Sequence, residues 1–163
     1  MIYRVKQFFW AVSSYFKHID IDYVNENLTP EERAIFLKLK NSEQQHSIRV
    51  AKLCDKFEKQ YKHIDGRKLR TVALLHDIGK IGTALTVMDK SILVILNKIT
   101  RGKIQKSKSK KIDIYYNHGK YGALILENLG YDEDMVYAVR NHHNNHAAKT
   151  DMLDILQKCD NIS

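Results

Sequence analysis

The stretch that decides the fold reads Leu74-Leu75-His76-Asp77-Ile78-Gly79-Lys80-Ile81. The residues before it have helical spacing, because Leu69 and Val72 share a face with His76. We therefore expect a helix that runs from Arg67 to near Gly79, whose missing side chain suits a left-handed cap. An imidazole and a carboxylate would then lie side by side near the end of this helix.

The composition of the chain favours helices. The chain has 163 residues, of which 44% are apolar, with one proline and seven glycines. A chain of this length supports one domain with a hydrophobic core, and the scarcity of helix breakers favours long helices over β-structure. We predict an all-α fold, a single-domain helical bundle of about six to eight helices.

Helical patterns continue on both sides of the central stretch. Residues 3–18 form an amphipathic pattern, and we assign 1–28 to an N-terminal helix that packs on a domain spanning 29–163. Thr29-Pro30-Glu31-Glu32 has the form of a capping box, from which one long helix or two in succession should run to about Tyr61. The remaining helical segments are an apolar stretch over 85–99 and patterns over about 115–129, 133–143 and 150 to the end.

Charge and cysteine usage narrow the choice of compartment and partners. The formal net charge of +8 favours anionic partners. Two cysteines without CxxC pairing and the lack of a leader pattern predict a cytoplasmic protein, and no stretch reaches the roughly 20 apolar residues of a spanning helix. The sequence leaves the oligomeric state open, a homodimer included.

The basic run from Arg101 to Lys111 is predicted to be an exposed loop. A solvated loop is the simpler interpretation, and electrostatic steering of a polyanionic substrate is the alternative. No aromatic residues that could stack on bases are interleaved in the run, so we expect no stable nucleic-acid complex.

Ionisable residues share the apolar face of five helical segments. They are His46, His76, His118, His142 and Asp160. Any one of them is most simply a hydrogen-bonded core residue. Burying all five without compensation would cost on the order of several kcal/mol each, so either a hydrogen-bond network or a cation must be present.

A metal centre would satisfy all of these side chains at once. Imidazole and carboxylate ligands without thiolate favour Mn, Fe, Co, Ni or Zn over Ca or Mg. Asp77 has two oxygens and could bridge two ions. Such a pair of ions would activate a water molecule and clamp a phosphoryl group.

The same residues, in this order, resemble the HD superfamily of metal-dependent phosphohydrolases, in its HDIG subgroup. The resemblance covers about His46 to Asp160 and rests on five signatures, which are His46-Ser47-Ile48-Arg49-Val50-Ala51, the central stretch, His118-Gly119-Lys120-Tyr121-Gly122-Ala123, His142-His143 and Cys159-Asp160. It implies two divalent transition-metal ions, one held by His46, His76, Asp77 and Asp160 and the other by His118 with His142 or His143. The helical offsets leave that last choice open.

The sequence differs from one related group of enzymes in a way that bears on the number of metals and on the substrate. The sequence resembles the HD-GYP cyclic-di-GMP phosphodiesterases around His76 but lacks the GYP motif after His143. Ser42 also stands where those enzymes can place an acidic residue. We therefore expect two metals rather than three, and a substrate other than cyclic-di-GMP.

The leading hypothesis is hydrolysis of a phosphate ester or anhydride in an anionic small molecule, a nucleotide, by metal-activated water. The resemblance makes Asp77 and Lys80 the catalytic residues, with Lys80 beside the substrate phosphate. Arg49 could bind substrate or form an ion pair on the helix surface. The alternatives are a diiron oxygenase of the same fold and a non-enzymatic nucleotide-binding sensor. Deoxynucleotides, alarmones, dinucleoside polyphosphates and cyclic nucleotides all stay open as substrates.

Overall fold

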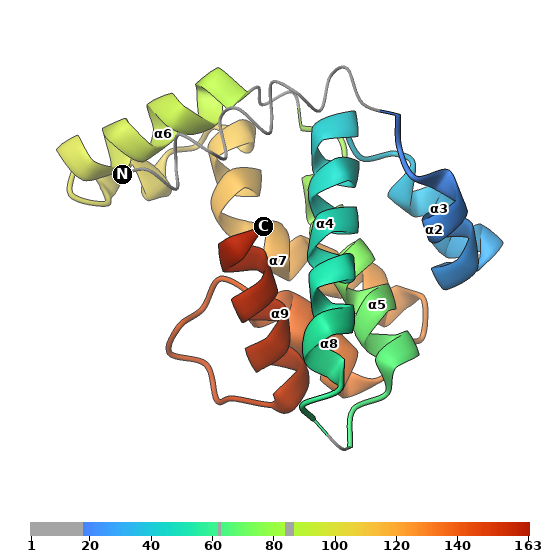
Figure 1. The fold of residues 1–163 in the computed structure, drawn as a ribbon. Coiled ribbons are helices and arrows are strands. Elements are labelled where there is room, and N and C mark those ends of the chain that lie inside the picture. The colour runs from blue at the N-terminus through green and yellow to red at the C-terminus, as the bar shows by residue number, and fades with distance from the viewer. Residues whose placement is uncertain (1–17, 62, 84–86) are drawn as a thin grey trace.

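The structure is a computed structural model that describes residues 18–61, 63–83 and 87–163, and within these ranges the chain is helical without any strand (Figure 1). The helices are α2 (Ile21–Asn27), α3 (Pro30–Phe36), α4 (Asn41–Glu58), α5 (Gly66–Leu75), α6 (Val87–Ile99), α7 (Lys110–Asn128), α8 (Glu133–Asn141) and α9 (Asp151–Ile162), with 3-10 helices η1 (Ile78–Lys80) and η2 (Lys103–Lys106). The predicted all-α fold is confirmed.

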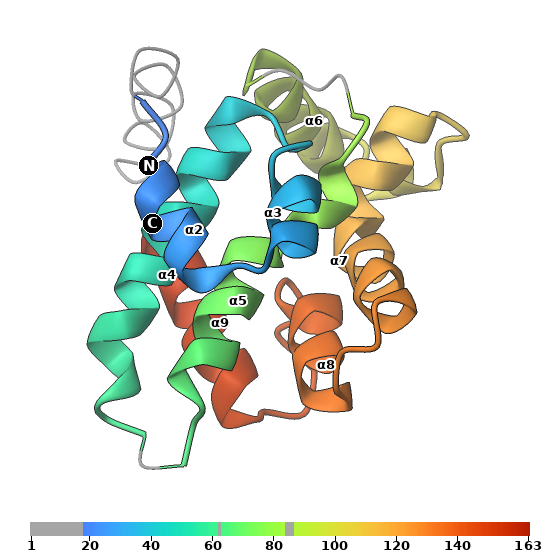
Figure 2. The ribbon, with the colours of Figure 1, turned by 90° about the vertical axis from the view of Figure 1, so that its right-hand side faces the viewer.

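The core forms around α5, which packs against α4, α8 and α9 (Figure 2). Its residues Leu69, Val72, Leu74 and Leu75 are all buried, so this helix presents apolar side chains on most of its circumference. Helices on several sides of α5 cover those side chains, which fixes the position of the residues that follow Leu75 in the chain.

The helix starts follow their capping signals. The Thr29 hydroxyl accepts from the Glu32 backbone N–H, and the Glu32 carboxylate accepts from the Thr29 N–H at 2.7 Å, which confirms the predicted capping box. The segment that follows forms two helices, α3 and α4, rather than one. Thr150 caps α9 in the same way through the Leu153 N–H.

The left-handed cap predicted at Gly79 is wrong. The α-helix ends at Leu75, and Gly79 lies in η1 without a positive φ. A Cβ at this position would lie 1.9 Å from the His118 carbonyl oxygen and 2.6 Å from the Gly122 nitrogen, both backbone atoms of α7. The glycine is therefore required because η1 lies directly against α7.

The basic run is exposed as predicted, but it is not one irregular loop, because residues 103–106 and 110–111 are helical. Residues 103–106 form η2, and α7 begins at Lys110 rather than near Tyr115. Asp113 in the first turn suits the positive end of the helix dipole, and its carboxylate accepts from the Asn117 side chain at 2.7 Å. These contacts extend the helix toward its N-terminus beyond the apolar pattern.

The N-terminal prediction falls largely outside the described residues. Of the segment assigned to 1–28, the structure describes 18–28, where Val24 and Leu28 are buried in the core. Among the described helices, none combines the length and the apolar composition needed to cross a membrane.

Candidate metal centre

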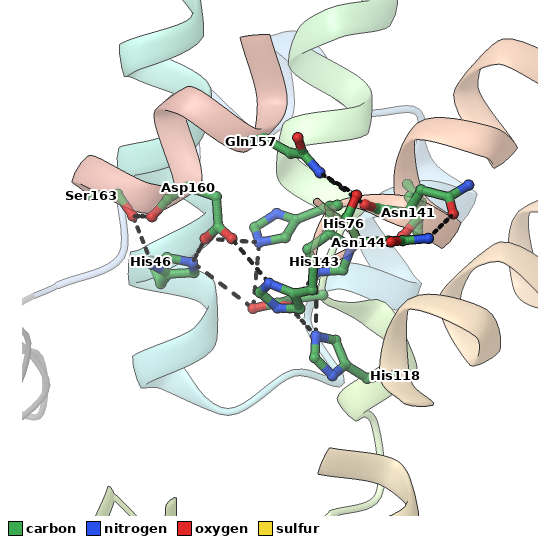
Figure 3. Close-up of polar contacts among 12 residues, drawn as sticks. His46, His76, His118, Asn141, His143, Asn144, Gln157, Asp160 and Ser163 are labelled. Carbon is green, nitrogen blue, oxygen red and sulfur yellow. Dashed lines mark hydrogen bonds and ion pairs between the residues drawn. The ribbon is translucent and has the colours of Figure 1, made fainter. Parts of the chain in front are cut away.

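The seven residues predicted as metal ligands lie together, although they come from five parts of the chain. His46 lies on α4, His76 and Asp77 follow α5, His118 lies on α7, His142 and His143 follow α8, and Asp160 lies on α9. Figure 3 shows the side chains of His46, His76, His118, His143 and Asp160 directed toward one another. Three overlapping groups have candidate ligand atoms within 4.8 Å of one another, namely Asp77 with His118, His142 and His143, His46 with His76 and Asp77, and His76 with His142 and Asp160.

Asp77 lies at the centre of the cluster and divides it into two parts. Its Oδ2 is 3.5 Å from His76 Nε2 and 4.0 Å from His46 Nε2. Its Oδ1 is 3.3 Å from His118 Nε2 and 3.7 Å from His142 Nε2. Each carboxylate oxygen therefore faces a different pair of imidazoles.

Asp160 completes the part of the cluster that contains His46 and His76. Its Oδ1 lies 2.9 Å from His46 Nε2 and 3.8 Å from His76 Nε2. On the other side, His118 Nε2 and His142 Nε2 are 3.2 Å apart. Ligand atoms of mixed nitrogen and oxygen type thus converge from both sides of Asp77.

Backbone carbonyls fix the orientation of three of these imidazoles. Nδ1 of His76, His118 and His142 lies 2.7, 2.8 and 2.6 Å from the carbonyl oxygen three residues earlier in the chain. A carbonyl can only accept, so each Nδ1 donates, and the Nε2 atom that faces the cluster is the one left to bind a cation. This is the arrangement that metal-binding histidines commonly adopt.

His46 lies between Ser163 and Asp160. The Ser163 hydroxyl oxygen is 3.0 Å from His46 Nδ1, and His46 Nε2 is 2.9 Å from Asp160 Oδ1. The Nε2 atom of this ring is therefore the one that faces the other candidate ligands.

The cluster therefore contains acceptors without donors, and a cation fits it. The buried His76 Nε2 and Asp77 Oδ1 have no hydrogen-bond partner. The Nε2 atoms of His118 and His142 face each other, while the Nδ1 atom of each ring contacts a backbone carbonyl oxygen. Divalent transition metals bind imidazole nitrogen and carboxylate oxygen, so a bound ion would compensate all of these atoms.

The buried groups hold the protonation states that metal binding requires. Burial lowers the pKa of His76 from 6.5 to about 4, so the ring is neutral at pH 7. Burial alone would raise the pKa of Asp77, but the positive charge of Lys80 and the contacts with the imidazoles bring it well below its usual value. Asp160 has a lowered pKa for a similar reason, since its contacts with His46 and His76 outweigh its burial.

Lys80 brings a further carboxylate, Glu43, next to the cluster. Lys80 Nζ lies 2.6 Å from Asp77 Oδ2 and 3.2 Å from Glu43 Oε2. Burial opposes the charge on Lys80, but these two carboxylates raise its pKa above the ordinary lysine value. Glu43 was missed in the sequence, although its place three residues before His46, nearly one helical turn, is a usable signal.

A buried glutamine, Gln157, supports the end of α8 and was also missed. Its side-chain nitrogen donates to the carbonyl oxygens of Asn141 at 3.0 Å and Asn144 at 3.2 Å (Figure 3). These bonds hold the turn that carries both His142 and His143. Gln157 precedes Asp160 by three residues, so the two side chains rise from neighbouring positions on α9.

The two adjacent histidines differ in their surroundings. His142 is 3% exposed and points into the cluster, whereas the His143 side chain is 57% exposed and its Nδ1 lies 3.7 Å from Asp160 Oδ2. His142 therefore belongs to the buried part of the cluster. His143 lies where the cluster opens to solvent.

Arg49, predicted as a substrate contact, lies outside the groups of candidate ligands. It lines an open hollow of about 290 Å³ together with Lys52, Lys56, Leu53, Ile162 and Ser163. Because Ser163 lines this hollow and its hydroxyl contacts His46, the hollow adjoins the cluster between α4 and the end of α9.

Comparison with known proteins identifies one family. The sequence model of the HD domain matches residues 44–163, which include all seven side chains of the cluster. No match was found among curated proteins or among solved structures.

Proposed function

The chain belongs to the HD domain family, and on that premise we propose that it is a metal-dependent phosphohydrolase that cleaves a phosphate ester or anhydride of a nucleotide. The observation that supports this proposal most is the position of Asp77, because each of its oxygens faces a separate pair of histidine Nε2 atoms. A carboxylate in this position is suited to bridge two cations.

We assign the ligands by their distances to the two oxygens of Asp77. One site would contain His46, His76 and Asp160, and the other His118 and His142, with Asp77 shared and His143 beside the solvent opening. Divalent Mn, Fe, Co, Ni or Zn ions bound there would supply Lewis acidity, which lowers the pKa of a water molecule and offsets charge on phosphoryl oxygens.

Lys80 supplies a positive charge that belongs to the chain itself. Its raised pKa keeps the ammonium protonated, so it can donate to a phosphoryl oxygen on which charge develops. If Asp77 held cations, its contact with Lys80 would weaken. Glu43 is then the second carboxylate that keeps the Lys80 ammonium beside the site.

The substrate enters, in this proposal, from the side of His143. This imidazole is the exposed member of the cluster, and the buried ones lie beneath it. Arg49, in the adjoining hollow, is our candidate for a second contact to an anionic substrate. The positive charges of Lys80 and Arg49 favour phosphate-bearing molecules over neutral ones.

Elemental analysis and a matched pair of variants test the proposal. Protein purified without added metal should contain a divalent transition metal and hydrolyse bis(p-nitrophenyl) phosphate or members of a nucleotide library when Mn is supplied. Asp77→Asn should lose turnover by roughly three orders of magnitude and lose bound metal, because one oxygen becomes an amide nitrogen that cannot ligate. His63→Ala, at an exposed histidine outside the cluster, serves as the control.

Two outcomes would contradict the proposal. One is an Asp77→Asn protein with unchanged metal content and turnover. The other is turnover that stops under anaerobic conditions, which would support the oxygenase alternative, since hydrolysis does not consume oxygen.

A further inference from the structure

An apolar stripe on α6 faces solvent. Ile92, Ile95, Leu96 and Ile99 are 49, 58, 37 and 71% exposed, and we call them the α6 stripe. Their spacing of three, four and seven residues places them on one face of the helix. Exposed apolar side chains that gather on one face mark an interaction site more often than scattered ones do.

A second face of α6, which carries Leu93 and Asn97, packs on the protein. Leu93 is only 6% exposed, and the Asn97 carbonyl and side chain bond to Gly102 and Gln105 in and next to η2. Both ribbon views place α6 at one end of the molecule, away from α8 and α9 (Figures 1 and 2). None of the described elements covers the stripe enough to bury it.

The net charge of the protein is concentrated around this stripe. The segment between Asp89 and Asp113 contains eight lysines and arginines and no acidic residue. The rest of the chain carries 19 basic and 19 acidic residues, so the whole formal charge of +8 resides in this segment. The described cations Lys98, Arg101, Lys103, Lys106, Lys108, Lys110 and Lys111 are all exposed.

This charge determines which occupant fits the stripe. A second copy would bring two segments of the same sign together, and residues 1–17 are themselves basic, with Arg4, Lys6 and Lys17 and no acid. A nucleic acid would suit the cations but not four exposed aliphatic side chains. An apolar face bordered by lysines is the chemistry that binds an anionic lipid surface.

We propose that the α6 stripe and the adjoining cations form a docking surface for the face of an anionic lipid bilayer. The stripe enters the boundary between headgroups and acyl chains, and the cations of residues 98–111 contact the anionic headgroups. Docking of this kind goes beyond the proposed hydrolysis and leaves turnover of a water-soluble substrate unaffected.

Vesicle flotation with the full chain tests this proposal. The protein should float with vesicles of phosphatidylcholine and phosphatidylglycerol and not with vesicles of phosphatidylcholine alone, and the bound fraction should fall as salt is raised. A variant with both Ile95→Ser and Ile99→Ser should bind about tenfold more weakly or worse, because it loses half of the apolar stripe. A variant with both Lys106→Glu and Lys108→Glu should show a comparable loss at low salt.

Matched controls separate this surface from the rest of the molecule. Leu124→Ser removes a side chain that is 51% exposed on α7, and Lys38→Glu with Lys59→Glu changes two exposed lysines elsewhere. Both controls should bind vesicles as the unmodified chain does, and all variants should keep the same helical circular dichroism and the same turnover of a soluble substrate.

Three results would overturn the proposal. The first is an absence of binding to anionic vesicles at low salt. The second is equal binding of the Ile95→Ser, Ile99→Ser variant, which would assign docking to another segment such as residues 1–17. The third is a dimer of the unmodified chain in sedimentation that this variant abolishes, which would assign the stripe to contact between copies.

Discussion

The candidate metal centre and the α6 region depart in opposite ways from what is expected of a folded chain. Around Asp77 the protein buries imidazoles and carboxylates whose acceptor atoms lack donors, whereas on α6 it exposes aliphatic side chains that would ordinarily be covered. The difference arises because α4, α5, α8 and α9 cover one another, while α6 is covered on one face only. In each place the unsatisfied groups suit a partner of a particular chemistry, a divalent cation in the first and, in our proposal, an anionic lipid surface in the second.

The largest expected effect is a loss of stability at Gly79, close to the candidate metal centre. Gly79→Ala should lower the free energy of unfolding by roughly 3 kcal/mol or more, because its Cβ would meet backbone atoms of His118 and Gly122 that cannot rotate away. Gly82→Ala is the control, since nothing lies within 4 Å and only its positive φ of 79° is strained. Urea unfolding measures both, and equal midpoints for the two variants would contradict the close packing of η1 on α7.

The next effect tests whether a cation compensates the buried acceptors. Adding Mn or Zn at about 100 times its dissociation constant should stabilise the metal-free protein by about 2.7 kcal/mol, a rise in Tm of roughly 5–10 °C. His118→Ala should lose most of this rise, because it removes one of the Nε2 atoms that face Asp77. His63→Ala should keep it. Equal rises in both variants would place the bound ion outside the cluster.

A pH titration of the metal-free protein comes third in size. The folded state holds His76 neutral down to about pH 4, whereas the unfolded chain binds a proton at 6.5, so stability falls as pH falls between these values. Asp77 and Asp160, whose pKa values are lowered from 3.8, add to the loss only at more acidic pH. His76 alone should lower the free energy of unfolding in urea by roughly 2 kcal/mol between pH 7 and pH 5, and His118 and His143, whose pKa values burial also lowers, add to this loss.

Replacement of His76 provides the control for this titration. His76→Gln lacks the titrating ring and should show a shallower dependence over the same range. A flat profile for the unmodified chain would mean that the buried ring accepts a proton without cost.

The smallest expected effect is the change in stability when a side chain of the exposed α6 stripe is replaced. Ile95→Ser should change the free energy of unfolding by no more than about 0.5 kcal/mol, because the side chain is 58% exposed. Leu153→Ser, at a fully buried position, should lower the free energy of unfolding by several times more. Urea unfolding of the two variants checks this. A large loss at Ile95 would mean that the α6 stripe contributes to the core.

The sequence predicted the fold class and the grouping of the cluster because both depend on helical periodicity. Apolar residues recur beside His46, His142 and Asp160 at intervals that place them on inward faces, and the structure brings these side chains together. The capping box at Thr29 was equally readable, since it depends on residues three apart.

Other features depend on contacts between distant segments, which no local pattern encodes. The need for glycine at position 79 comes from the backbone of α7, and Glu43 enters the site through Lys80, which lies 37 residues away. The exposed side of α6 was invisible for the same reason. An apolar stripe predicts a buried face, and only the arrangement of neighbours reveals that this one is uncovered.

The ends of α5 and α8 have a consequence for how cations are attracted. His76 and His142 occupy the C-terminal capping positions of these helices, so the negative ends of two helix dipoles lie beside the cluster. Each such end favours positive charge by about 0.3–1 kcal/mol, independently of any side chain. The backbone thus favours metal ions at the cluster before any ligand bond has formed, and it disfavours free anions that arrive without a metal ion.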